Sequence, residues 1–202
     1  MRRRHLRGVL AIEQLVYPKP WSASLFASEI AQPDSRRYLA AVSRDRAGVF
    51  GRRPVLGYAG VLVTVGEAHI TTVATHPHHH RRKVASRLLV HLLRAARELG
   101  AQAATLEVRV NNRGAQRLYS SFGFAPVGVR PKYYAETNED ALIMWAYDLQ
   151  AEGYAAVLDE QEARLQEPGG ASGAADLHVP WVRERIGLSP DDSVAPDEGW
   201  TG

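Results

Sequence analysis

The chain has 202 residues, the upper end of one ordinary domain, and its 45% hydrophobic and 23% charged residues exclude a wholly disordered or fibrous protein. Because it has no cysteine, disulfides, thiolate catalysis and cysteine-ligated zinc are excluded as well. The formal charge of +3 combines a basic part, residues 1–150, with an acidic part, residues 151–202; the basic part suggests phosphate-bearing ligands or nucleic acid as partners, or merely a solvated surface.

The start of the chain predicts two short helices. Apolar residues recur at roughly the helical period from Leu6 to Tyr17, and Pro18 ends this segment because proline disfavours helix in the residue before it. Ser22 stands where an N-cap belongs for the second helix. No apolar run approaches the roughly 18 residues of a membrane span, and no cleavage-like site follows the basic start, so we predict a cytoplasmic protein without a membrane partner.

Strands and helices then alternate. We expect strands over 38–42, 55–65 and 68–75, a helix over 84–99, a strand over 104–110, a helix over 112–122 that Asn112 caps, and strands over 125–130 and 140–149. This order predicts a mixed α/β (α+β) fold in which a mostly antiparallel mixed sheet carries helices on both faces. We divide the chain into one domain over 1–150 and an acidic extension over 151–202, helical over 151–166 and then largely flexible.

A cationic turn precedes the helix that begins near Val84. The first turn of a helix exposes unpaired N–H groups and attracts anions such as phosphate. Arg81, Arg82 and Lys83 add three cations at this end, where cations are unfavourable without a compensating anion. The alternative is a solvated basic turn. The neighbouring histidines, at 76 and 78–80, have no acidic ligand nearby, so a solvated turn is a better interpretation of them than a metal site.

Several motifs occur together in one order. They are Val73-Ala74-Thr75-His76-Pro77, Arg81-Arg82-Lys83-Val84-Ala85-Ser86-Arg87-Leu88-Leu89, Leu106-Glu107-Val108-Arg109, Asn111-Asn112, Leu118-Tyr119 and Phe122-Gly123-Phe124. In this order and spacing the chain resembles the GNAT acetyltransferases over roughly residues 5–149. Pro20-Trp21-Ser22 and Tyr133-Tyr134 make it similar to the ribosomal-protein-alanine N-acetyltransferases, the RimI type.

The resemblance implies a GNAT fold with splayed central strands over 1–150. It implies transfer of acetyl from acetyl-coenzyme A, as co-substrate, to the N-terminal α-amine of a protein, by direct attack in a ternary complex and without a metal. The expected partner is a ribosomal protein beginning in alanine. Nucleic acid would bind only indirectly or weakly, and the protein would be a monomer or a dimer.

The resemblance also assigns the coenzyme contacts. The pantetheine arm would pair with the backbone of Val73, Ala74 and Thr75, and Asn112 would contact the coenzyme near that arm. The pyrophosphate would lie on the turn made by Arg81, Arg82, Lys83, Val84, Ala85 and Ser86. Lys83 departs from the family pattern, which has glycine there: lysine must adopt an unfavourable conformation or shift the loop, and its ammonium can offset this by contacting phosphate.

Glu107 is the candidate general base. An α-amine has a pKa of about 7.7–8.0 and is mostly protonated at neutral pH, so a carboxylate must accept its proton, directly or through water. Glu107 is the only acid between Glu98 and Glu136, in a strand with apolar neighbours. Alternatively, it is an exposed strand residue paired with Arg109.

Tyr119 is the candidate general acid. The departing thiolate needs a proton because a thiol titrates near about 8.5, and a phenol with a pKa of about 10 is a protonated donor at neutral pH. Alternatively, Tyr119 is an aromatic anchor packed against Leu118 and Phe122.

The acceptor groove is assigned by resemblance to Trp21, Tyr133 and Tyr134, with core packing as the alternative for Trp21. Nearby acids, Glu136, Glu139 and Asp140, can bind a basic peptide tail.

Two other functions stay open. One keeps the chemistry with a lysine side chain or a small-molecule amine as acceptor. The other is a non-catalytic coenzyme- or RNA-binding module, with Lys83 as the mark of lost activity.

Overall fold

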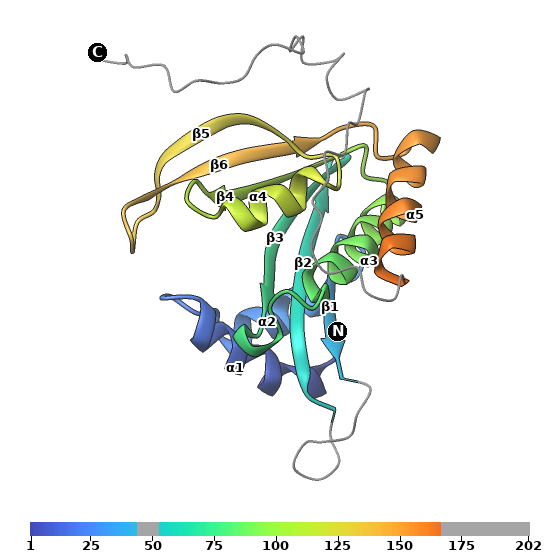
Figure 1. Cartoon of the computed structure of the whole chain (residues 1–202). Helices are drawn as coiled ribbons and strands as arrows, with labels where there is room; N and C mark the ends of the chain where they lie inside the picture. Colours follow the sequence, from blue (N-terminus) through green and yellow to red (C-terminus); the bar gives the residue numbers. More distant parts are fainter. Residues whose placement is uncertain (44–52, 167–202) are drawn as a thin grey trace, which may run out of the picture.

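One mixed sheet runs through the described residues, 1–43 and 53–166, of this computed structural model (Figure 1). Its strand order is β1-β2-β3-β4-β6-β5, and all neighbours are antiparallel except β3 and β4. The strands are β1 (Arg36–Val42), β2 (Val55–Thr64), β3 (Glu67–Thr75), β4 (Ala103–Arg109), β5 (Ala125–Tyr134) and β6 (Glu139–Ala146).

Five α-helices of the described part cover the two faces of this sheet. They are α1 (Leu6–Val16), α2 (Ala23–Ile30), α3 (Val84–Glu98), α4 (Arg113–Ser120) and α5 (Glu152–Gln166); short 3-10 turns span Arg3–His5 and Pro77–His79. The predicted caps are present: the Ser22 hydroxyl accepts the Leu25 N–H at the start of α2, and the Asn112 side chain accepts the Ala115 N–H at the start of α4.

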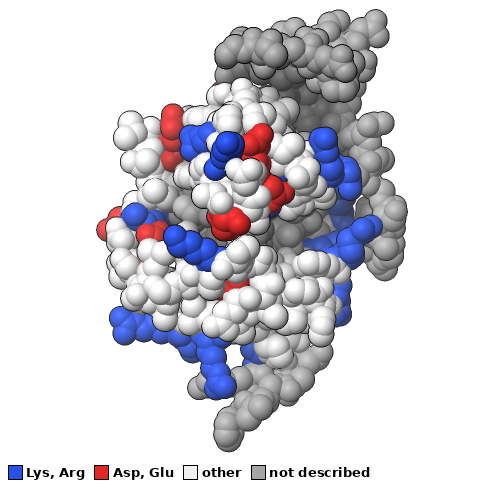
Figure 2. Space-filling view, turned by 90° about the vertical axis from the view of Figure 1, so that its left-hand side faces the viewer, with Lys and Arg blue, Asp and Glu red and all other residues white. Residues whose placement is uncertain are grey.

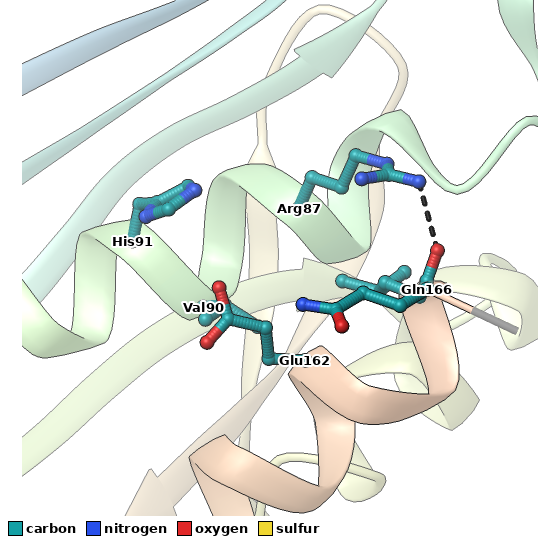
Figure 3. Close-up of a pocket in the computed structure, with 6 residues that line it drawn as sticks. Arg87, Val90, His91, Glu162 and Gln166 are labelled. Atoms are coloured by element: carbon teal, nitrogen blue, oxygen red, sulfur yellow. Dashed lines mark hydrogen bonds between the residues drawn. The ribbon is translucent and has the colours of Figure 1, made fainter.

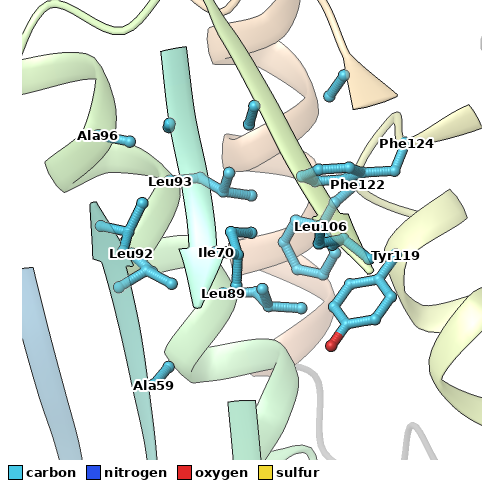
Figure 4. Packing of buried hydrophobic residues seen from close by; sticks show 14 of the residues in the cluster. Ala59, Ile70, Leu89, Leu92, Leu93, Ala96, Leu106, Tyr119, Phe122 and Phe124 are labelled. Atoms are coloured by element: carbon cyan, nitrogen blue, oxygen red, sulfur yellow. The ribbon is translucent and has the colours of Figure 1, made fainter. Parts of the chain in front are cut away.

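Two apolar clusters fix the helices to the sheet. On one face, α3, α4 and α5 pack with β3 and β4 around residues such as Leu89, Leu106 and Phe122 (Figure 4). On the other face, α1 and α2 enclose a smaller cluster that contains Phe26 and Tyr58. The predicted fold class, a mostly antiparallel α/β sheet with helices on both faces, is confirmed.

The fifth strand is longer than its sequence pattern suggests. The prediction ends it at residue 130, but β5 continues to Tyr134 through an irregularity in its pairing with β6. Lys132 has a positive φ of 51° there, and its N–H donates to the Asp140 carboxylate at 2.8 Å. A side chain replaces the ladder bond at this point, which alternation of apolar residues cannot reveal.

The helix beyond residue 150 belongs to the main core. In α5, Tyr154, Leu158 and Leu165 are buried and join the cluster that α3 forms with the sheet. The residues after Gln166, including the predicted linker, lie outside the described part. Within residues 1–43 and 53–166, no helix combines the length and apolarity that crossing a membrane would take.

Candidate active site

The sheet opens between β3 and β4. These strands pair at only three positions, Glu67 with Ala103, Ala68 with Ala104 and His69 with Thr105. Beyond His69 they diverge, so that β4, β6 and β5 turn away from β3 (Figure 1). The prediction of splayed central strands is confirmed, and one edge of β3, over residues 70–75, is left without a strand partner.

The backbone of this edge faces the opening at alternate residues. The His76 N–H donates to the Leu56 carbonyl at 2.9 Å, toward β2. Because backbone groups alternate sides along a strand, those of Thr75 and Val73 face away from β2 and those of Ala74 face it. The Tyr17 hydroxyl accordingly donates to the Val73 carbonyl at 3.4 Å. Of the three residues assigned to pantetheine, two thus present their backbone to the opening.

Tyr17 is a residue that the sequence analysis missed. It follows α1, and its hydroxyl also lies 3.4 Å from the Thr72 hydroxyl on β3. Burial raises the pKa of this phenol. Only its place before Pro18 distinguishes it in the sequence.

Glu13 holds the connection between α1 and α2. Its side chain is buried, accepts the Trp21 N–H at 2.7 Å and accepts the Tyr58 hydroxyl. The sequence did carry a signal, since Glu13 falls on the apolar stripe of Val9 and Ile12. A buried acid on such a stripe needs donors, and here they fix the loop that carries Trp21.

Glu107 lies on β4 at the inner end of the opening. Its side chain is only 9% exposed; one carboxylate oxygen is 2.8 Å from Nε2 of His69 and the other is 3.1 Å from a guanidinium nitrogen of Arg130. The alternative of an exposed residue paired with Arg109 is therefore wrong. His69 and Arg130 come from β3 and β5, so only the folded sheet brings them to Glu107.

Arg109 is committed to the β5–β6 hairpin. It is 3.0 Å from the Glu136 carboxylate, contacts that of Glu139, and lies 3.9 Å from the centre of the Tyr134 ring. One guanidinium thus serves two carboxylates, so Glu136 and Glu139 keep a net negative charge, and their binding of a basic peptide tail stays a prediction. The Asp140 carboxylate accepts the Lys132 N–H, which is an uncharged donor.

The two tyrosines of the hairpin differ in exposure. Tyr134 donates to the Glu107 carbonyl at 3.3 Å, and burial raises its pKa to about 12 although Arg109 opposes the shift. Tyr133 is 42% exposed, with its ring edge-on to Tyr134. Trp21 packs against Phe26 at 5.4 Å between ring centroids.

These acceptor candidates lie on one side of the molecule. The α1–α2 connection and the tip of the β5–β6 hairpin both extend to the left in Figure 1. Figure 2 views this side: acidic and basic side chains are mixed over its upper half, and basic ones predominate at its lower end.

Tyr119 is an aromatic anchor of the core, and its role as general acid stays a prediction. Its ring packs in the larger cluster, 6.1 Å from that of Phe124, while its hydroxyl points away from Phe122 and Phe124 (Figure 4). Burial is the main cause of the raised pKa of the Tyr119 hydroxyl. The phenol therefore stays protonated at neutral pH, as a proton donor must.

The turn before α3 is left-handed at two residues. Arg81 and Lys83 have φ values of 60° and 59°, a conformation that costs of order 1 kcal/mol or more for residues other than glycine. Lys83 thus adopts the unfavourable backbone that its position predicts. Its ammonium donates to the Arg164 carbonyl of α5 at 2.6 Å, and its contact with phosphate stays a prediction.

The opening and this turn fit the coenzyme that the sequence suggests. The free edge of β3 offers backbone groups to an amide-containing arm, and the first turn of α3, at Val84, Ala85 and Ser86, has no side-chain cap on its N–H groups. Arg81 and Arg82 add positive charge beside them. The His76 ring lies edge-on to that of His78 and tilted against that of His79. No group of metal-ligating side chains occurs within residues 1–43 and 53–166.

Comparisons with known proteins agree with this geometry. Residues 6–124 match the acetyltransferase (GNAT) family. The chain is 33% identical over 135 residues to the [ribosomal protein bS18]-alanine N-acetyltransferase of Escherichia coli K12, covering 66% of this chain and 84% of that protein. It is 33% identical over 139 residues to the N-alpha-acetyltransferase RimI of Mycobacterium tuberculosis, covering 67% and 80%.

Solved structures show the same fold. The crystal structure of the ribosomal-protein-S18-alanine N-acetyltransferase from Escherichia coli superposes with a TM-score of 0.59 at 30% identity, covering 73% of this chain and 90% of that one. Ard1 from Thermoplasma volcanium gives a TM-score of 0.60 at 26% identity, covering 73% and 93%.

Proposed function

The chain belongs to the GNAT acetyltransferase family, and from this premise we propose that it acetylates the N-terminal α-amine of a ribosomal protein that begins with alanine. The observation that carries the proposal is the opening between β3 and β4 with Glu107 at its inner end. The relatives named for ribosomal protein bS18 support that protein as the acceptor.

Acetyl-coenzyme A, when bound, supplies the acetyl group as a thioester. Val73 and Thr75 would hold its arm through their backbone, and Arg81, Arg82 and the first N–H groups of α3 would hold its phosphates. The side-chain oxygen of Asn112 accepts the Ala115 N–H at the start of α4. Asn112 is also proposed to contact the coenzyme near its pantetheine arm.

Glu107 is proposed to accept the proton of the α-amine. Its two oxygens are each engaged by one donor, and a carboxylate oxygen can accept more than one hydrogen bond. The amine or a bridging water therefore finds an acceptor that His69 and Arg130 hold in one orientation. In the neutral amine, the nitrogen lone pair is free to attack.

The bond changes balance with one base and one acid. The amine nitrogen forms a bond to the acetyl carbon, and the carbon–sulfur bond breaks. Glu107 passes the ammonium proton to water and then accepts the second proton that the nitrogen loses after it has bonded to the acetyl carbon. Tyr119 gives its phenolic proton to the sulfur, and the proton held by Glu107 returns to the tyrosinate through water. The raised pKa of Tyr119 keeps that proton available at neutral pH.

Trp21, Tyr133 and Tyr134 are proposed to border the acceptor groove. Tyr134 is tied to the backbone of Glu107, and Trp21 to Glu13, so both walls are anchored to residues around the opening. Aromatic walls suit a small first residue such as alanine better than a long charged side chain.

Mass spectrometry of a ribosomal-protein peptide library, incubated with enzyme and acetyl donor, tests the proposal. We expect acetylation at the α-amine of peptides that begin with alanine. Matched peptides with a blocked N-terminus and a free lysine should remain unmodified. Preferential labelling of those lysines would assign another acceptor, and calorimetric binding of acetyl-coenzyme A without any transfer would indicate a non-catalytic module.

A further inference from the structure

The head of α3 is held by the far end of α5. The Lys83 ammonium donates to the carbonyl of Arg164 at 2.6 Å, and the Arg87 guanidinium donates to that of Leu165 at 2.8 Å. Figure 3 shows Arg87 reaching this last turn of α5. Arg87 also lines a small hollow of about 70 Å³ between the two helices. The final carbonyls of a helix lack partners within the helix, so two side chains of α3 satisfy two of them.

Other contacts keep α5 in this position. Arg94 of α3 lies 2.7 Å from both Asp159 and Glu162 of α5. Tyr154 and Leu158 are fully buried against the core, and α5 runs alongside α3 in Figure 1. The alignment of its C-terminus with the head of α3 is therefore fixed along the whole helix.

The contacts with α5 divide the four basic residues at the start of α3 into two pairs. Arg81, Arg82, Lys83 and Arg87 gather where the α3 dipole is itself positive, so they repel one another and the helix end. The C-terminus of α5 brings the negative end of a second helix dipole to Lys83 and Arg87. Arg81 and Arg82 remain for an anionic ligand.

We propose that α5 is a clamp that holds the coenzyme turn in its left-handed shape, with Lys83 and Arg87 as positioning residues. A lysine in the position of the usual glycine is tolerated because its side chain is anchored on α5. The part of the proposal that concerns coenzyme affinity rests on the proposed function. The part that concerns the shape of the turn does not depend on the proposed function, because it is tested without ligand.

Two substitutions at one residue separate the clamp from its surroundings. Arg164→Pro displaces the last turn of α5, because proline cannot donate an N–H and its ring clashes with the preceding turn. Arg164→Ala is the matched control: it removes the surface pair with Glu160 but keeps the carbonyl that Lys83 uses. Lys83→Met removes the donor and leaves α5 intact.

The first readout is hydrogen exchange at the amides of residues 87–90 in the full-length protein without ligand, because these amides close the first turns of α3, as the Arg87 N–H does on the Lys83 carbonyl at 3.1 Å. We expect Arg164→Pro and Lys83→Met to exchange at least about fivefold faster there, and Arg164→Ala to match the wild type. Equal exchange in all four proteins would overturn the clamp. If Arg164→Pro fails to fold, the comparison of Lys83→Met with Arg164→Ala tests the clamp.

The second readout is affinity for coenzyme A by calorimetry, with steady-state rates. Arg164→Pro and Lys83→Met should raise Kd and the KM for acetyl-coenzyme A at least about fivefold, with kcat at saturation within twofold. Acetyl-pantetheine, which lacks the phosphates, should react equally with all variants. Equal losses with both donors would mean general damage and overturn the positioning role. If the wild type binds no coenzyme, the proposed function fails while the exchange comparison still judges the clamp.

Discussion

The two strands that border the opening differ in what they offer. From Ile70 to Thr75, β3 presents uncharged side chains and a backbone edge without a strand partner, on which side chains such as Tyr17 and His80 contact the carbonyls. On β4, the charged side chain of Glu107 contacts His69 and Arg130. That of Arg109 contacts Glu136, Glu139, Thr137 and the Tyr134 ring. We therefore call β3 the backbone wall of the opening and β4 its side-chain wall.

Because of this difference, we expect the two strands to differ in how strongly substitutions affect activity. A backbone edge depends on strand geometry and tolerates many side chains, whereas a proton transfer depends on one functional group at one place. We therefore expect substitutions on the β4 side of the opening to affect the chemical step strongly. Substitutions on the β3 side that preserve the backbone should have small effects.

Glu107→Gln should have the largest effect. Glutamine keeps the shape and can still contact His69 and Arg130, but it cannot accept a proton as a base. We expect kcat with an alanine peptide to fall by about 10²-fold or more. Stopped-time assays with a mass-spectrometric readout measure this, and melting temperature serves as the control for folding.

The same variant can break the comparison. If turnover of Glu107→Gln equals that of the wild type, the side-chain wall has no acid–base role and the proton leaves by another route. His69→Gln is the matched variant, because it alters the partner of Glu107 without removing the carboxylate, and its loss should be smaller.

Tyr119→Phe should also reduce kcat by about 10²-fold, since the sulfur then lacks its proton donor. Burial raises the pKa of Tyr119 above that of an ordinary phenol, so the donor stays protonated as pH rises through the usual assay range. The wild-type kcat should accordingly show no fall up to about pH 9 that is due to this group. The ring of phenylalanine preserves the packing with Phe124, so an unchanged rate would leave Tyr119 as an aromatic anchor only.

Arg109→Ala should act on the acceptor rather than on the chemistry. It removes the guanidinium that joins the Tyr134 ring to Glu136 and Glu139, which loosens the hairpin. Ion pairs and cation–π contacts of this kind are worth about 1 kcal/mol, so the KM for a peptide without basic residues should rise about fivefold. Arg109→Lys keeps the charge and should recover part of the loss; a fall in kcat instead would place Arg109 in the chemical step.

Much of the site follows from local sequence patterns. The helix caps at Ser22 and Asn112, the cationic turn before α3 and the strand that carries Glu107 are each recognisable from a few neighbouring residues. The family resemblance added the splay of β3 from β4, since no local pattern states which strands separate.

The partners of these residues could not be predicted in the same way. His69 is 38 positions from Glu107 in sequence, and Lys83 is 81 positions from Arg164. Such contacts depend on strand order and on the docking of α5, which short-range periodicity does not encode. The family resemblance implies that Lys83 stands where glycine is usual, and only the structure shows what Lys83 contacts.

Thr75→Val should have the smallest effect and tests the backbone wall directly. Valine has nearly the shape of threonine and leaves the N–H and carbonyl of this residue facing the opening. We expect the KM for acetyl-coenzyme A and kcat to stay within about twofold. Thr75→Pro, which removes the N–H, is the paired variant and should raise that KM strongly, because proline cannot donate a hydrogen bond. A large loss in the valine variant would mean that β3 also recognises its ligand through side chains, and the contrast between the two walls would then be one of degree.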